Sequence, residues 1–127
     1  MTVALDTNAC SDFLRGVPSR VQVVRTATRL ALPLMVPGEL RAGFACGRRT
    51  AENLATLRQF LSSPRVSILH LDETTTETYA RIFLQLRNKG AAIPINDLWI
   101  AALALQHDMD LCSSDAHFAE VDGLRLC

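Results

Sequence analysis

The sequence predicts an α/β fold, a three-layer α/β/α sandwich whose central sheet is mostly parallel and has four or five strands. Two observations favour it. Short apolar runs, typical of buried strands, alternate along the chain with segments in which apolar residues recur at helical spacing. Strands that alternate with helices pair in parallel, with right-handed connections that leave helices on both faces of the sheet. With 127 residues, 49% of them hydrophobic, we expect a single domain over residues 1–127.

The first third of the chain predicts two strands and two helices. Residues 3–5 form a short apolar run that predicts a buried strand, and Asn8 is well placed to cap a helix over residues 10–14. A second helix is expected over residues 19–30, and residues 32–36 then predict the next strand.

The middle of the chain predicts three helices and one strand. Apolar residues recur at helical spacing over residues 38–47 and again over residues 50–61. Residues 66–71 predict a strand, and Asp72 then offers a cap for a long helix over residues 73–88.

The last third contains the most apolar helix, which begins at Asn96 or Asp97 and extends to about residue 106. Because this helix is apolar on nearly every face, it must be buried. Residues 111–113 predict a further strand, and residues 124–127 predict a last strand at an edge of the sheet.

Four carboxylates stand where a predicted strand gives way to a helix or a loop: Asp6, Glu39, Asp97 and Asp115. In an open parallel sheet, ligands bind outside the carboxyl ends of the strands, so these side chains would converge. Like charges in a shared pocket repel, and a divalent cation that prefers oxygen ligands, Mg²⁺ or Mn²⁺, would offset that repulsion. We therefore expect all four to be catalytic residues and metal ligands. Asp6 and Asp97 are expected to bind the cation directly, and Glu39 and Asp115 directly or through water, with one of them able to act as a base.

Each acid also has a simpler explanation as a cap or a turn residue. For Asp6 that explanation is weakened because Asn8 is the better-placed cap. Glu39 falls in the first turn of its predicted helix, where the helix dipole alone favours a carboxylate, and Gly43 would let that helix pack closely. Asp97 could cap its helix, and an aspartate such as Asp115 is common in turns.

Three further residues are candidates for supporting roles. Asn8 could orient Asp6 or a water molecule, and Ser113 could hydrogen-bond one of the acids from behind. His117 could act as a general acid or contact phosphate, but we expect a partly exposed histidine that packs near Phe118.

Composition excludes several other classes. The formal net charge is zero, so no global field attracts a polyanion, although nearly all the basic residues are arginines, which bind phosphate through a planar fork. The cysteines form no CxxC pair, which argues against a zinc site. The apolar stretches are shorter than the roughly 18 residues that a membrane span needs. We expect no signal peptide, no membrane contact and a cytoplasmic location.

The acidic residues lie in motifs that together resemble the PIN-domain ribonucleases, and most closely the VapC-like toxins of bacterial type II toxin–antitoxin pairs. The motifs are DTN at residues 6–8, GELRAG at 38–43, NDLWIAA at 96–102 and SSDAHF at 113–118. The resemblance implies a PIN fold and an Mg²⁺- or Mn²⁺-dependent endoribonuclease whose acidic quartet is Asp6, Glu39, Asp97 and Asp115, with Ser113 beside it. It also implies a homodimer that acts on transfer or ribosomal RNA. A small VapB-like antitoxin would inhibit it and would carry any contact with operator DNA.

Three other functions share part of this pattern. A haloacid-dehalogenase phosphatase also begins with a strand that ends in Asp, but it needs a second Asp two residues later, where this chain has Asn8. A receiver domain needs a lysine after a late strand, and the only lysine, Lys89, precedes Asp97. The third rival is a PIN-like module that binds DNA with an antitoxin partner and regulates transcription without significant nuclease turnover. Nuclease assays with titrated metal separate it from the enzyme.

Overall fold

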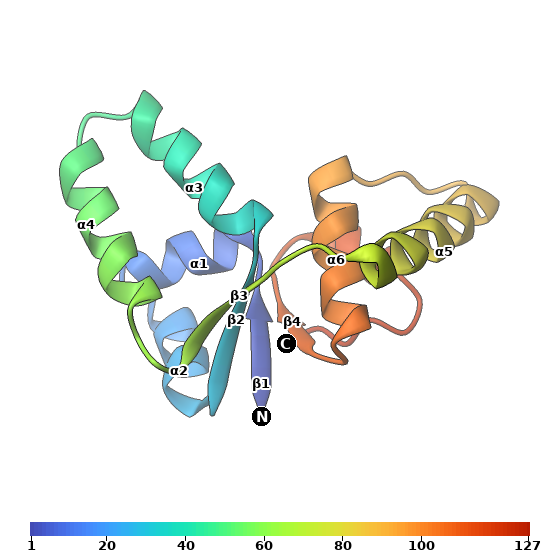
Figure 1. Cartoon of the computed structure of the whole chain (residues 1–127), viewed down its shortest axis with the longest axis horizontal. Coiled ribbons are helices and arrows are strands. Elements are labelled where there is room, and N and C mark those ends of the chain that lie inside the picture. The colour runs from blue at the N-terminus through green and yellow to red at the C-terminus, as the bar shows by residue number, and fades with distance from the viewer.

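The computed structural model describes residues 1–127 and places a sheet of four strands between two groups of helices (Figure 1). The strands are β1 (Thr2–Leu5), β2 (Arg29–Pro33), β3 (Val66–Leu69) and β4 (Asp110–Cys112). Their order across the sheet is β3-β2-β1-β4, and every neighbouring pair is parallel. The predicted α/β/α sandwich with a parallel sheet is therefore confirmed, with four strands.

Six α-helices cover the sheet, four on one side and two on the other (Figure 1). On the first side lie α1 (Thr7–Leu14), α2 (Pro18–Thr26), α3 (Met35–Cys46) and α4 (Thr50–Leu61). On the second side lie α5 (Glu73–Lys89) and α6 (Ile95–Gln106), and a 3₁₀ helix, η1 (Ala116–Glu120), follows β4. None of these helices combines the length and hydropathy that crossing a bilayer demands.

The core lies on both faces of the two central strands. Residues 3–5 of β1 and residues 30–33 of β2 are buried, as expected for strands that helices cover on both sides. Residues 100–104 of α6 are also buried, and this helix contacts β2 and β4. The prediction that the most apolar helix is a buried one is confirmed.

The segment that leads into α3 differs from the prediction. The second strand is Arg29–Pro33, three residues earlier than expected, and the preceding helix ends at Thr26. Leu30 pairs with Val3 on one side and with Val66 on the other. Pairing with two neighbouring strands thus decides the conformation of residues that helical spacing had assigned to a helix.

The predicted last strand over residues 124–127 is wrong in extent. Only one isolated parallel bridge forms there, between Leu111 and Leu126. Two backbone hydrogen bonds support it, from the Leu111 N–H to the Arg125 carbonyl at 2.8 Å and from the Cys127 N–H to the Leu111 carbonyl at 3.0 Å. The segment therefore covers the edge of β4 without extending the sheet.

The start of α5 matches its predicted cap at Asp72. Asp72 and Thr75 form a reciprocal capping box at its start, and the helix ends at Gly90, which has φ +72° in the left-handed region. By contrast, no heavy atom lies within 4 Å of the position that a Cβ at Gly43 would occupy, so the expectation that Gly43 permits close packing of α3 is wrong.

These two glycines predict stability changes of opposite sign. Gly43→Ala should stabilise the protein by about 0.5–1 kcal/mol, because alanine suits a helix interior better than glycine. Gly90→Ala should destabilise it by about 1 kcal/mol, because an L-residue is strained in the left-handed region. The midpoints of chemical unfolding measure both effects, and shifts of both variants in the same direction would contradict this account.

Candidate active site

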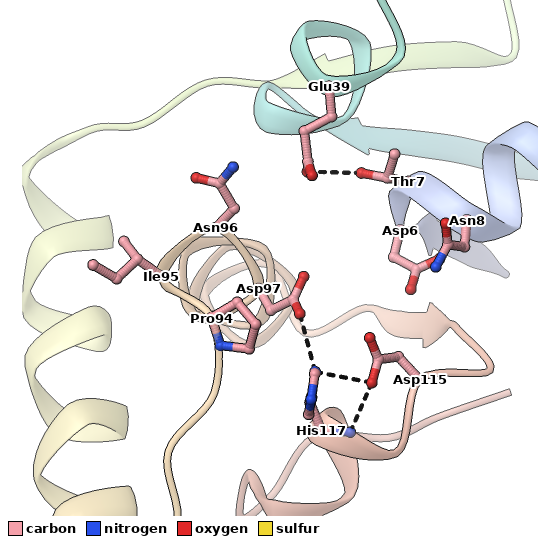
Figure 2. Close-up of a pocket in the computed structure, with 10 residues that line it drawn as sticks. All are labelled: Asp6, Thr7, Asn8, Glu39, Pro94, Ile95, Asn96, Asp97, Asp115 and His117. Carbon is pink, nitrogen blue, oxygen red and sulfur yellow. Dashed lines mark hydrogen bonds and ion pairs between the residues drawn. The ribbon is translucent and has the colours of Figure 1, made fainter. Parts of the chain in front are cut away.

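The carboxyl ends of the parallel strands open into a cavity of about 590 Å³, which Figure 2 shows with its lining residues. Asp6 directly follows β1, and Asp115 follows β4 as the N-cap of η1. Asp97 lies in the first turn of α6, as the sequence predicted, and Glu39 reaches the cavity from α3. The structure thus brings all four predicted acids to one cavity, and Asn8 lines it as well.

Asp6 is held at both carboxylate oxygens and is only 4% exposed. Its Oδ1 accepts a hydrogen bond from the Ala9 backbone N–H at 2.8 Å, and its Oδ2 accepts one from the Ser113 hydroxyl at 2.5 Å. Asp6 is therefore the N-cap of α1, and the prediction that Asn8 caps this helix is wrong. The helix begins at Thr7, so Asn8 already lies inside its first turn, with its side chain exposed.

Glu39 lies one turn further into its helix than the sequence predicted. The helix begins at Met35 instead of near residue 38, because Pro37 is tolerated in a first turn, where its missing N–H has no helical partner. The Glu39 carboxylate projects from the second turn toward α1 and accepts a hydrogen bond from the Thr7 hydroxyl at 2.8 Å (Figure 2). This bond joins α3 to the start of α1 at the rim of the cavity.

Asp97, Asp115 and His117 form the tightest group in the cavity. The Nδ1 atom of His117 lies 3.3 Å from an oxygen of Asp97 and 2.9 Å from an oxygen of Asp115 (Figure 2). One potential ligand atom from each of the three lies within 4.8 Å of the others. Asp6 and Glu39 belong to no group as tight as this one.

His117 is partly exposed, as expected. Its ring faces the two aspartates, a contact that the sequence prediction did not include. The Asp115 carboxylate also accepts a hydrogen bond from the His117 backbone N–H at 3.0 Å, which starts η1. The signal was available, because a residue two positions after a capping Asp lies beside that carboxylate.

The carboxylates affect one another electrostatically. Burial raises the pKa of Asp6 above its ordinary value, against the opposing effects of its hydrogen bonds, and the Asp115 charge adds to the rise. Burial also raises the pKa of Asp97, and Asp115 and Glu39 both add to that rise, while His117 opposes it. The four acids therefore form one cluster in which full ionisation is unfavourable without a compensating positive charge.

The donor set fits a hard divalent cation. The cavity offers carboxylate oxygens from separate elements, with one imidazole nitrogen and the amide groups of Asn8 and Asn96 beside them. Oxygen donors of this kind suit Mg²⁺ and Mn²⁺, and a bound cation would offset the repulsion among the acids. All the lining residues except Pro94 and Ile95 are polar or charged, so the cavity is suited to a charged ligand.

Comparison with known proteins assigns the chain to a family. A model of the PIN domain matches residues 3–124. Ribonuclease VapC5 of Mycobacterium tuberculosis is 34% identical over 98 residues, which cover 75% of this chain and 70% of that protein. Ribonuclease VapC4 of the same organism is 32% identical over 89 residues, or 70% of this chain and 68% of that protein. The chain therefore belongs to the PIN-domain family and, within it, to the VapC-like toxins.

Solved structures with the same fold extend the likeness over the whole chain. VapBC2 from Rickettsia felis, bound to a DNA fragment from its promoter, has a TM-score of 0.87 at 26% identity and covers 100% of this chain and 98% of that one. VapBC-5 from Mycobacterium tuberculosis has a TM-score of 0.73 at 27% identity and covers 99% of this chain and 95% of that one.

Proposed function

We propose that this protein is a metal-dependent endoribonuclease and the toxin of a type II toxin–antitoxin pair, which hydrolyses phosphodiester bonds of transfer or ribosomal RNA. The observation that carries this activity is the convergence of four carboxylates and an imidazole on one polar cavity at the carboxyl ends of the strands. The ribonuclease names of the relatives support it. An acidic cavity alone would repel a phosphate, so a cation is required to bring the two together.

Asp6, Glu39, Asp97 and Asp115 would hold Mg²⁺ or Mn²⁺, with His117 beside two of them. When bound, such a cation makes a water molecule more acidic and offsets the negative charge that grows on the phosphate during hydrolysis. The helices and strand ends that carry the acids fix the positions of the carboxylates before the ligand binds.

Two hydroxyl groups keep the acids in these positions. Thr7 holds Glu39, and Ser113 holds Asp6 while its own oxygen accepts the backbone N–H of Asp115 at 2.9 Å. The His117 ring lies between Asp97 and Asp115, and in this proposal it donates a proton to the leaving oxygen of the RNA.

The partners follow from the same proposal. The structural relatives named above are toxin–antitoxin complexes, which supports a small VapB-like antitoxin as the inhibitor, with operator DNA contacted only through it. We also propose a homodimer, because Phe83 and Leu84 on α5 and Ile95 on α6 are large apolar residues that are more than half exposed. Sedimentation equilibrium checks the dimer by its mass.

A cleavage assay tests the activity. Purified protein incubated with structured RNA should cut it in Mg²⁺ or Mn²⁺, leave 5′-phosphate and 3′-hydroxyl ends, and lose all cleavage in excess EDTA. Restoring the metal should restore cleavage, which excludes loss of the protein as the cause. Cleavage that persists in EDTA would rule out this chemistry, and RNA or DNA binding without turnover at any metal concentration would favour the non-enzymatic alternative.

A further inference from the structure

Arg20, on α2, connects that helix to the segment that carries Asp115. Its Nη1 donates to the Cys112 sulfur at 2.9 Å, and its Nη2 donates to the Ser114 hydroxyl. The two contacts use the planar fork of one guanidinium, and they hold the last residue of β4 and a residue of the segment that joins β4 to η1.

The position of Arg20 is not explained by the stability of its own helix. Arg20 is the third residue of α2, which begins at Pro18 and has no acidic residue in its first turn. A cation near a helix N-terminus opposes the helix dipole. The side chain is half-buried and directed toward the site, where its charge lowers the pKa of Asp6 against the dominant effect of burial.

The segment that Arg20 contacts determines the position of two acids. Ser113 donates to Asp6 and accepts the Asp115 N–H, so one hydroxyl links both carboxylates. Cys112 precedes this serine and Ser114 follows it, and Arg20 binds both. A shift of the segment would therefore move the Ser113 hydroxyl and the Asp115 carboxylate together.

We propose that Arg20 is a positioning residue of the site, which fixes the Cys112–Asp115 segment so that Asp115 and the Ser113-bound Asp6 are held ready for the cation. This inference rests on the proposed metal-dependent function and deepens it. Arg20 acts through Ser114 and Cys112, and it is not among the residues that line the cavity.

Two other roles for Arg20 predict different results. If its charge were what mattered, Arg20→Lys would behave as wild type, and Arg20→Gln would bind cations more tightly because a nearby positive charge is lost. If it contacted RNA phosphate, its variants would bind RNA more weakly, with a shallower dependence on salt. For a positioning role, lysine is insufficient, because its single ammonium cannot replace the fork.

Calorimetric titration of Mn²⁺ into the protein without RNA separates these roles. Both Arg20→Lys and Arg20→Gln should weaken Mn²⁺ binding by about tenfold, the lower end of the range for residues that support metal ligands. Arg25→Lys and Arg25→Gln, changes at an exposed arginine in the last turn of the same helix, are the matched controls and should bind Mn²⁺ as wild type does. Wild-type Mn²⁺ affinity in Arg20→Lys would overturn the proposal.

Kinetics on RNA at saturating Mn²⁺ give a second readout. The Arg20 variants should lower kcat and leave KM for RNA unchanged, whereas a raised KM with normal Mn²⁺ affinity would overturn the proposal in favour of an RNA contact. A wild-type protein that binds Mn²⁺ without cutting RNA contradicts the proposed function alone, since the titration still tests Arg20. A wild-type protein that neither binds Mn²⁺ nor cuts RNA contradicts both.

Discussion

Asp97→Asn is expected to lower kcat for RNA cleavage by about a thousandfold, which corresponds to several kcal/mol of lost transition-state stabilisation by the cation. Asparagine keeps the size of the side chain and one oxygen, but it removes the negative charge that attracts the cation. The first-turn position in α6 remains suitable for it, and the His117 ring keeps an oxygen to contact. Single-turnover rates at high Mg²⁺ measure the loss, and circular dichroism reports whether the fold is unchanged.

Asp12→Asn is the matched control for this experiment. Asp12 lies on α1, where its carboxylate pairs with Arg15 away from the cavity, so this change should alter the rate by less than about twofold, as expected for an exposed pair. A rate for Asp97→Asn within tenfold of wild type, with the fold intact, would remove Asp97 from the proposed catalytic group.

The placement of the four acids could be predicted because it follows from topology. Once strands and helices alternate, a parallel sheet gathers its carboxyl ends at one edge, and any side chain just beyond a strand lies there. Asp6 directly follows β1, Asp115 lies three residues after β4, and Asp97 is in the first turn of the buried helix. None of this required knowledge of side-chain conformation.

What could not be predicted depends on contacts between distant residues. Asp6 caps α1 with one oxygen and accepts a hydrogen bond from Ser113, far along the chain, with the other, and the sequence around Asp6 gives no sign of the second bond. The contacts of Arg20 could not be predicted for the same reason, since its partners are on β4 and the segment that follows it. The strand at Arg29–Pro33 is likewise defined by its two neighbours in the sheet and not by its own spacing.

The use of Asp6 as both helix cap and candidate metal ligand has a consequence for stability. Burial and the Asp115 charge raise its pKa above the ordinary 3.8, so at neutral pH the folded protein holds an unfavourable carboxylate. Asparagine can still accept the Ala9 N–H as an N-cap, and it has no charge to bury. Ionisation of Asp6 therefore opposes folding whenever no cation is bound.

Asp6→Asn is accordingly expected to stabilise the cation-free protein at pH 7 by about 0.5–2 kcal/mol, the usual range for a single stabilising substitution, while abolishing RNA cleavage. Because the folded-state pKa lies above the unfolded-state value, both states of the wild type are protonated at low pH and the difference disappears there. It grows as the pH rises through the folded-state pKa. Urea unfolding in EDTA from pH 3.5 to 7 measures the trend, with Asp12→Asn as the control that should not follow it.

Adding Mg²⁺ at pH 7 should make the wild type more stable than Asp6→Asn. A cation that binds the folded wild type stabilises it in proportion to the logarithm of the ratio of cation concentration to dissociation constant. Asp6→Asn lacks one of the charges that hold the cation and should gain less. The two measurements together separate a functional carboxylate from a structural one. If the Asp6 carboxylate served only to stabilise the fold, Asp6→Asn would be less stable than wild type in EDTA at pH 7. That result would contradict this account of Asp6.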